Sequence, residues 1–155
     1  MVSVRIRLTN TDAVARVSIQ DAAVIMAFKW RAHPSRHTQY AVRYAKGHHY
    51  VSMHESILSK GCDHIDRNGL NNTRSNLRPA TRSQQRMNAK LQRNNRSGHR
   101  GVHWHSKEKK WRARINVGGK RIELGEFKEF PDAVAARRAA VAMYFGEYAA
   151  EHERN

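Results

Sequence analysis

The sequence predicts an α+β fold, in which short antiparallel sheets and single helices follow one another along 155 residues. Two observations predict it. Apolar and polar residues alternate with the period of a strand in several short runs, and Gly- and Asn-containing turn signals join these runs. Apolar residues recur with helical spacing in only a few places. The chain separates into three segments, each too small to bury a large core alone.

The first segment begins with a predicted strand and helix. Val14, Val17 and Ile19 have strand character and lead into the apolar run AAVIMAF. Asp21 precedes that run, so we expect it to cap a short helix that ends near Trp30.

A hairpin is predicted next. Tyr40, Val42 and Tyr44 alternate with Gln, Ala and Arg, and HHYVSMH follows a Lys46-Gly47 turn. This alternation predicts a hairpin with one buried face.

The second segment, about 61–90, is poor in apolar residues and rich in Asn, Arg, Asp and His, so something other than a core must organise it. Asp63 and His64 precede a Gly-containing turn, the chain returns through Asn76, and a helix starts near Thr81. The expected motif is a hairpin followed by a helix. Residues 91–97 have no periodicity and are expected to form a basic linker.

The third segment has the clearest pattern. One face of a predicted strand carries Trp111, Ala113, Ile115 and Val117, and the other face is polar. Gly118-Gly119 supplies the positive φ angles of a tight turn, and KRIELGEF returns with Ile122 and Leu124 inward. A preceding RGVHWH strand makes the sheet three-stranded. Pro131-Asp132 then opens a helix whose apolar side, formed by Val134, Val141, Phe145 and Tyr148, can cover the sheet.

The charge indicates a polyanionic partner. Lys and Arg total 29 against 13 Asp and Glu, a formal net charge of +16. The basic residues are interleaved with Trp, Tyr, His and Asn, which favours a folded nucleic-acid surface over a disordered basic arm. The expected partner is therefore a nucleic acid.

Several classes are excluded. No run approaches the ~18 apolar residues of a membrane span, and the opening MVSVRIRLTN lacks the apolar stretch of a secretory signal. We therefore expect a soluble cytoplasmic protein with no membrane or small-molecule partner. The single Cys62 excludes an intramolecular disulfide and a multi-Cys zinc site.

The Asp63-His64 pair has the chemistry of phosphodiester hydrolysis. This reaction needs a divalent cation to neutralise developing charge and a base to activate water. Asp63 can act as a hard oxygen ligand. Neutral imidazole, with an ordinary pKa near 6.5 in a histidine such as His64, can accept a proton at physiological pH.

The string DHIDRNGLNNTRSNLR resembles the HNH homing endonucleases of phage introns and their free-standing relatives. The resemblance covers roughly residues 10–90. It includes the VSMH element, which ends at His54, and the spacing of twelve positions from His64 to Asn76. It implies an N-terminal HNH nuclease domain over 1–90, with a ββα-metal core over about 54–90. It further implies double-stranded DNA as the partner and a phage or its bacterial host cell as the setting. It also implies that Asp63 is a metal ligand, His64 the general base, and Asn76 a brace for the loop and His64.

This sequence departs from the family at the third ligand. Gln85 stands where the family usually has Asn, and Asn88 follows on roughly the same helix face. Either amide could complete the metal site. The oxygen donors favour Mg²⁺ or Mn²⁺ over zinc.

Other residues near the motif have simpler interpretations. His54 is expected to pack as a hydrogen-bonded histidine. His48, His49 and His99 are expected to be solvated loop residues. The basic helix residues Arg82 and Arg86 are either a solvated face or phosphate contacts.

Residues 98–150 resemble the Apetala/ethylene-response-factor DNA-binding domain, known from plant transcription factors and also attached to phage HNH nucleases. In that family the sheet lies in the major groove and its outward side chains contact DNA. The plant pattern has Arg at several positions where this chain has His or Asn, so only the docking mode carries over. Trp104 and Trp111 are expected to pack between sheet and helix, with base stacking left open for Trp104. The aligned outward positions are Arg100, His103, His105, Arg112, Arg114, Asn116, Arg121 and Glu123.

Three functions follow from these patterns. The first is a metal-dependent, site-directed DNA endonuclease or nicking enzyme. Its single active site predicts a monomer that cuts one strand, and a double-strand break would need a dimer or a second binding event. The second is a DNA-binding regulator with a decayed nuclease site, which Gln85 makes reasonable. The third is an RNA-binding accessory protein.

Overall fold

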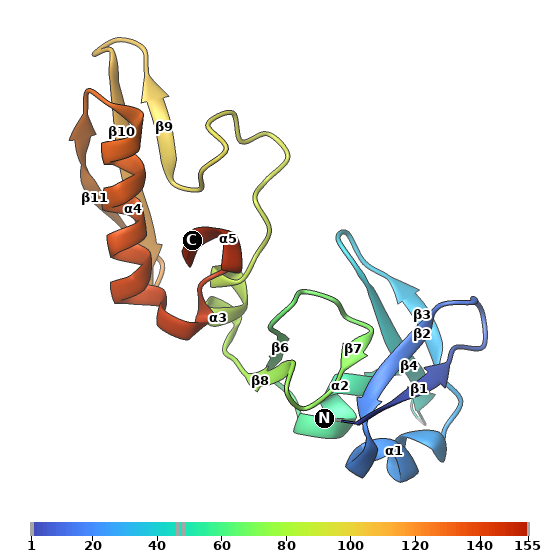
Figure 1. The fold of residues 1–155 in the computed structure, drawn as a ribbon. Coiled ribbons are helices and arrows are strands. Elements are labelled where there is room, and N and C mark those ends of the chain that lie inside the picture. Colours follow the sequence, from blue (N-terminus) through green and yellow to red (C-terminus); the bar gives the residue numbers. More distant parts are fainter. Residues whose placement is uncertain (1, 46, 48, 155) are drawn as a thin grey trace. The chain divides into compact units, whose positions relative to one another are not determined.

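A computed structural model describes residues 2–45, 47 and 49–154 of the chain (Figure 1). The predicted α+β class is confirmed, because helices and several small sheets alternate along the chain. Two compact units divide it, Met1–Arg82 and Ser83–Asn155, and each forms a body by itself. The division lies within helix α3 (Arg82–Met87), whereas the predicted nuclease domain ran to residue 90. No helix in the described ranges is long and apolar enough to cross a membrane.

Short strands of the first unit form three small sheets, with the orders β1-β2-β7, β3-β4-β5 and β6-β8. Two short helices, α1 and α2, join them. The bounds are β1 (Ser3–Arg7), β2 (Val14–Ser18), α1 (Ile19–Met26), β3 (Arg31–Pro34), β4 (Gln39–Ala45), β5 (His49–Ser52), α2 (Met53–Leu58), β6 (Cys62–His64), β7 (Asn71–Asn72) and β8 (Leu77–Pro79).

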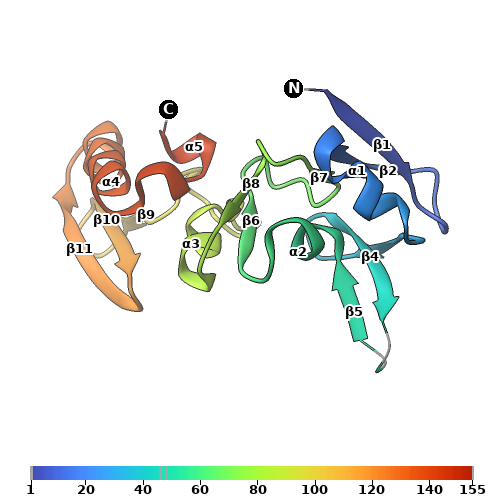
Figure 2. The same cartoon turned by 90° about the horizontal axis from the view of Figure 1, so that it is seen from below.

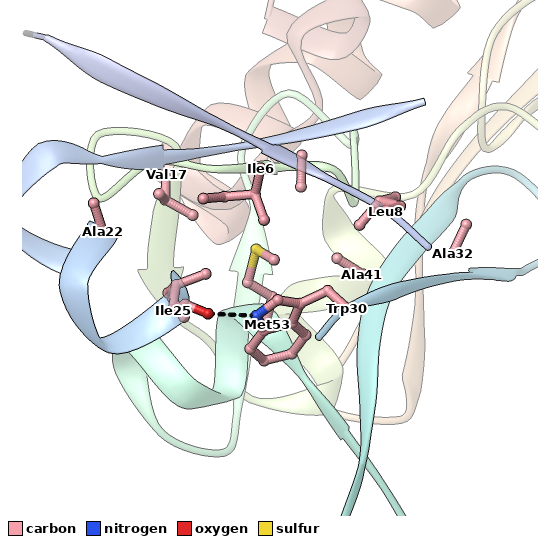
Figure 3. Packing of buried hydrophobic residues seen from close by; sticks show 10 residues of the cluster. Ile6, Leu8, Val17, Ala22, Ile25, Trp30, Ala32, Ala41 and Met53 are labelled. Carbon is pink, nitrogen blue, oxygen red and sulfur yellow. Dashed lines mark hydrogen bonds between the residues drawn. The ribbon is translucent and has the colours of Figure 1, made fainter. Parts of the chain in front are cut away.

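The core of this unit collects apolar side chains from β1, β2, α1, β4 and α2 (Figure 3). Trp30 is almost completely buried within it, and its indole nitrogen donates a hydrogen bond of 2.7 Å to the carbonyl oxygen of Ile25. Val17 and Met53 are fully buried. This core connects the two larger sheets to α2, which directly precedes the strand carrying Asp63 and His64.

The expected start of the first helix is wrong. Helix α1 begins at Ile19, which was expected in the strand, and the capping position is Ser18. Asp21 lies in the first turn, where its carboxylate accepts hydrogen bonds from Nε (2.9 Å) and Nη2 (2.8 Å) of Arg74. This long-range ion pair, and not a helix cap, accounts for Asp21.

The predicted hairpin is confirmed by β4 and β5, which pair with Tyr44 opposite Tyr50. The prediction of one buried face is wrong. The adjacent residues Ala41 and Val42 are both buried, so both faces of β4 are covered there, whereas Tyr44 is 58% exposed near the hairpin end. Lys46 and His48, for which a turn and a solvated position were expected, lie outside the described residues.

The second unit contains the predicted three-stranded antiparallel sheet covered by one helix (Figure 2). Its strand order is β11-β10-β9, and a bulge shifts the register of β10 and β11 between Ala113 and Arg114. The bounds are β9 (Val102–His105), β10 (Lys110–Val117), β11 (Lys120–Phe127), α4 (Phe130–Phe145), the 3₁₀ turn η1 (Gly146–Tyr148) and α5 (Glu151–Arg154).

The inward faces of this unit are those predicted. Ala113 and Ile115 are buried, and Ile115 joins Val141 and Phe145 of α4 in one cluster. Gly118 and Gly119 adopt φ angles of 56° and 81°, as a tight turn requires.

Two details of the carboxyl-terminal end are corrected. Tyr148 belongs to η1 and not to the covering helix. The domain was expected to end at residue 150, but Glu153 of α5 is buried and accepts a 2.6 Å bond from Nη2 of Arg137. The last helix therefore belongs to the packed unit.

Candidate active site

His64 lies at the end of β6 and is 6% exposed. Its Nε2 is 3.0 Å from Oδ1 of Asn72, a fully buried residue of β7. Because an amide oxygen only accepts hydrogen bonds, this contact places the proton of a neutral imidazole on Nε2. Nδ1 is then the nitrogen that can take a proton.

Asn72 itself is held by its surroundings. Its Nδ2 lies 3.4 Å from the sulfur of Met53 and 3.5 Å from the carbonyl oxygen of Gly69. Strand β7 pairs in parallel with β2, with Asn72 opposite Val17. The core of the unit therefore fixes the residue that orients His64.

Asn76 holds the loop between β6 and β8. Its Oδ1 accepts from the backbone nitrogen of Asp66 (2.9 Å), and its Nδ2 donates to Oδ1 of Asp66 (2.8 Å) and to the carbonyl of Asn71 (2.7 Å). The bond to the His64 imidazole described above comes from Asn72. Asn72 was not among the residues predicted from the sequence, because its only local signal is its place in the polar run NGLNNTR.

Asp63 stands directly opposite Arg78 in the β6–β8 pair. Its Oδ2 accepts bonds from Nη2 (2.9 Å) and Nε (3.2 Å) of Arg78, and both side chains are largely buried. The guanidinium balances the carboxylate charge in this sparsely hydrated place. Any cation bound by Asp63 would share this carboxylate with Arg78.

Aromatic rings surround the candidate base. The ring centroids of His54 and His64 are 4.9 Å apart, and Tyr40 lies 5.5 Å from His54 and 5.8 Å from His64. Nε2 of His54 is 3.2 Å from the hydroxyl of Ser52. The packing interpretation of His54 agrees with these contacts, which also place it beside the candidate base.

Burial keeps these histidines neutral. Desolvation lowers the pKa of His64 below its ordinary value, although the Asn72 hydrogen bond and nearby Asp66 and Asp63 oppose the effect. Desolvation, together with repulsion from His64 in its protonated form, lowers the pKa of His54 to about 4. Burial raises the pKa of Tyr40, and Asp63 adds to that rise. A neutral His64 at physiological pH is the form that a general base needs.

The remaining predicted ligands belong to the second unit. Gln85 is half-buried on α3, and Asn88, just after α3, is almost completely buried. Their assignment as metal ligands stays a prediction. Within the described ranges, no three His, Cys, Asp or Glu side chains group together as a metal site.

The predicted DNA-binding strands present their polar residues on one face. Across the sheet, Arg112 stands opposite His103 and Glu126, Arg114 opposite Glu123, and Asn116 opposite Arg121. Directly opposed residues share a face, and this face is opposite to the buried Ala113 and Ile115. The sheet can therefore present these side chains together to one partner.

The arginines of this face are not equivalent. Arg112 donates from Nε to Glu126 (2.6 Å) and from Nη2 to Glu108 (3.1 Å). No ion pair of Arg114 occurs among the described residues, although Glu123 stands opposite it in the sheet. Arg114 has the more available charge.

Arg100 precedes β9 and is therefore not an outward strand residue. Its Nη2 donates to the carbonyl of Arg86 (2.8 Å), and its Nη1 lies 3.3 Å from the carbonyl of Met87 and 3.5 Å from Glu153. This guanidinium holds α3 and α5 together inside the second unit. Arg82 and Arg86 have exposed side chains. Their exposure is compatible with both predicted alternatives, a solvated helix face and phosphate contacts.

Two aromatic expectations need correction. Trp104 is 47% exposed, so it does not fill the space under the helix, whereas Trp111 packs on Phe130 with ring centroids 4.6 Å apart. His99 is not a solvated loop residue, because it is half-buried with its ring 5.4 Å from that of Phe130. His49 is exposed, although it lies in β5 and not in a loop.

Basic residues of the first unit were missed. Arg5 and Arg16 stand directly opposite each other on β1 and β2, and both are exposed. Like charges in this position repel, and none of the described carboxylates forms an ion pair with either. A phosphate is an anion that could relieve this repulsion. The alternation in SVRIRL and VARVS was the signal that could have revealed the pair.

Comparison with known proteins gives one partial likeness. The chain is 38% identical over 58 residues to Protein 3.8 of Escherichia phage T7, a stretch that covers 37% of this chain and 48% of that protein. The chain thus spans about half the length of the curated relative it matches. No protein-family model matches the chain, and no solved structure matches it.

Proposed function

We propose that this protein is a metal-dependent endonuclease that hydrolyses a phosphodiester of double-stranded DNA, with His64 as the general base. The observation that carries the proposal is the buried His64 imidazole, oriented through Nε2 by Asn72 and preceded in β6 by the carboxylate residue Asp63. Such hydrolysis needs a neutral imidazole as the base and a hard oxygen ligand for the metal. The resemblance to HNH nucleases points to the same residues.

Each residue has one task in this proposal. Nδ1 of His64 takes the proton of the attacking water. Asn72 keeps the other proton on Nε2 and holds the ring, while Asn76 maintains the loop between β6 and β8. Tyr40 and His54 exclude bulk water from one side of the imidazole.

The carboxylate oxygens of Asp63 suit a hard divalent cation, and Asp63 would hold Mg²⁺ or Mn²⁺. The roles of the Gln85 and Asn88 amides stay separate predictions. Such a cation, when bound, neutralises charge that develops on the phosphate and on the leaving oxygen. Because Arg78 already pairs with Asp63, we expect weak metal binding that bound DNA strengthens.

Holding the duplex is the task proposed for the basic residues. The outer face of the β9–β10–β11 sheet offers Arg114 and Arg121 to a DNA groove, and Arg5 and Arg16 offer charge in the first unit. We infer a monomer that cuts one strand in each encounter.

The direct test is nicking of supercoiled DNA in Mg²⁺, with EDTA as the metal-free control. His64→Ala should abolish nicking, and Asn72→Ala should slow it about 10- to 100-fold because the base loses its orienting partner. A matched control is His49→Ala, an exposed histidine of the same unit, which should nick like the parent. Cleavage that persists in His64→Ala would show that His64 is not the base.

A second function is supported by one specific contact. The Asp63–Arg78 ion pair already satisfies the carboxylate, as it would in a DNA-binding protein that retains only the nuclease fold. In that case the protein binds DNA without nicking it at any Mg²⁺ concentration. Gln85→Asn separates the two: a gain of nicking indicates a weakened enzyme, and continued binding without nicking indicates a regulator.

A further inference from the structure

A row of rings crosses the β3-β4-β5 sheet and ends at His64. We call it the ring row. Neighbouring centroids are 5.3 Å apart for Tyr44 and Tyr50, 5.5 Å for Tyr50 and His33, 5.5 Å for Tyr40 and His54, and 4.9 Å for His54 and His64. His33 and Tyr40 stand directly opposite each other on β3 and β4, so the Tyr44–Tyr50–His33 rings and the Tyr40 ring lie on one face of the sheet.

The two ends of the ring row differ in burial. His64 is 6% exposed, whereas Tyr50 is 48% and Tyr44 58% exposed, and His33 is also exposed. Tyr50 meets both of its ring neighbours edge to face, an arrangement that leaves ring surface uncovered. The outer end therefore offers aromatic surface to a partner, and the inner end lies at the candidate base.

A cation accompanies the exposed rings. Arg31 stands opposite Val42, which shares a face of β4 with Tyr40 and Tyr44, so Arg31 lies on the face of the ring row. Its side chain is exposed, and none of the described acidic residues forms an ion pair with it. Surfaces that bind single-stranded nucleic acid combine exposed aromatic rings with nearby cations. The bases stack on the rings and the cations bind the backbone.

Cross-strand packing explains only part of this arrangement. The Tyr44–Tyr50 pair can stabilise a hairpin. Hairpin stability does not require the ring row to continue through His33 to Tyr40, His54 and His64, nor to carry a cation. In a paired duplex the bases stack on each other, so their faces cannot reach protein rings.

We propose that the outer end of the ring row stacks unpaired bases of the DNA strand whose phosphate reaches His64. The protein would then cut beside locally unpaired DNA, such as a bubble, in preference to a fully paired duplex. The cleavage part of this inference rests on the proposed nuclease function, and the stacking part rests on the rings alone.

Binding in EDTA tests the stacking without cleavage. The probes are a duplex with a central bubble of unpaired bases, one of them 2-aminopurine, and a fully paired duplex of the same length and flanks. We expect tighter binding of the bubble and a change in 2-aminopurine fluorescence on binding. Tyr50→Leu should weaken bubble binding roughly 5- to 100-fold and leave duplex binding unchanged, whereas Tyr50→Phe should bind like the parent.

Leucine keeps an apolar side chain in the hairpin, so the comparison with phenylalanine isolates the ring. Tyr144→Leu, which removes an exposed tyrosine of the second unit, is the matched control and should keep the bubble preference. Equal binding of bubble and duplex by the parent, or a bubble preference retained in Tyr50→Leu, overturns the proposal. So does tighter binding of a bubble made of RNA.

The nicking assay distinguishes a failure of the stacking proposal from a failure of the nuclease proposal. If Tyr50 governs bubble binding but no variant or condition gives nicking, the stacking surface stands and the nuclease proposal fails. If His64-dependent nicking occurs equally on bubble and duplex in the parent and in Tyr50→Leu, the nuclease proposal stands and the ring row has no part in choosing the substrate.

Discussion

His54 enters the folded first unit as an uncharged ring. Burial and the neighbouring His64 lower the pKa of His54 from an ordinary 6.5 to about 4, while Glu55 acts in the opposite direction. In the unfolded chain the same imidazole takes a proton near pH 6.5. Between these two values the unfolded state binds more protons than the folded state, so acid favours unfolding.

His54 therefore predicts a pH-dependent stability. Its contribution is fully present above pH 6.5 and is lost as the pH falls toward 4, amounting to about 2 kcal/mol between pH 7 and pH 5. His54→Phe keeps a ring beside Tyr40 but cannot titrate, so it should reduce the pH dependence by that amount. Urea unfolding at both pH values, with amide exchange in the first unit as the readout, measures this change in the pH dependence of stability.

The matched control for that measurement is His49→Phe, because His49 is exposed in β5. It should leave the difference between pH 7 and pH 5 unchanged. An unchanged difference in His54→Phe would mean that His54 is protonated to the same extent in the folded and unfolded states.

At the scale of elements, the chain entering β9 makes a close approach that only glycine allows. Gly101 has a φ of 75°, and a Cβ placed on it would overlap the carbonyl oxygen of Arg114. Gly98 has nearly the same φ, 74°, but a Cβ on Gly98 would meet no heavy atom within 4 Å among the described residues. A comparison of Gly98 with Gly101 therefore separates the cost of backbone strain from the cost of steric overlap.

Alanine at the two positions should therefore give different results. Gly98→Ala should cost about 1–2 kcal/mol, the strain of a left-handed backbone with a side chain. Gly101→Ala should cost roughly 1–3 kcal/mol more, because β9 must move away from β10. Urea unfolding with amide exchange in the second unit as the readout measures both costs. Equal costs would contradict the close packing of Gly101 on Arg114.

The last helix, α5, is attached through charge. Glu153 accepts bonds from Nε (3.2 Å) and Nη2 (2.6 Å) of Arg137, and both side chains are almost completely buried. Removing one partner of such a pair leaves a buried charge without compensation.

Glu153→Ala should accordingly destabilise the second unit by about 3–5 kcal/mol. Glu126→Ala is the comparison, because Glu126 pairs with Arg112 on the solvated face and its loss should change stability little. Thermal unfolding of both variants tests the contrast. A small effect of Glu153→Ala would mean that α5 detaches without disturbing the sheet and α4.

For the molecule as a whole, the net charge of +16 predicts DNA binding that weakens steeply with salt. The structure adds which arginines contribute. Two carboxylates hold the guanidinium of Arg112, whereas no ion pair involves Arg114 among the described residues. A phosphate contact by Arg114 releases a counterion without first breaking a salt bridge.

When the logarithm of the binding constant is plotted against the logarithm of the salt concentration, the slope is negative. Arg114→Ala should therefore reduce the magnitude of this slope by about one, and Arg112→Ala should reduce it less. Titrations of a labelled duplex in EDTA at several salt concentrations give both slopes. An equal or larger effect of Arg112→Ala would contradict the assignment of free charge to Arg114.

The sequence predicted those parts of the fold whose signals are local. The alternation through Ala113 and Ile115, the Gly118-Gly119 turn and the apolar spacing of Val141 and Phe145 lie within one or two elements. They led to the correct sheet and covering helix in the second unit. The strand–turn–strand character around Asp63 and His64 was predicted for the same reason.

The sequence by itself determined the Asp63-His64 pair, its hairpin and the basic character of the molecule, because residue type and short spacing carry this information. Only the tertiary structure decided that Asn72 orients His64, that Arg78 neutralises Asp63, and that Tyr40 of β4 and His54 of α2 pack against His64. These contacts depend on which strands pair and in which register. For β7 and β2, which lie far apart in the sequence, that choice is made by burial of the shared core around Trp30 and Met53.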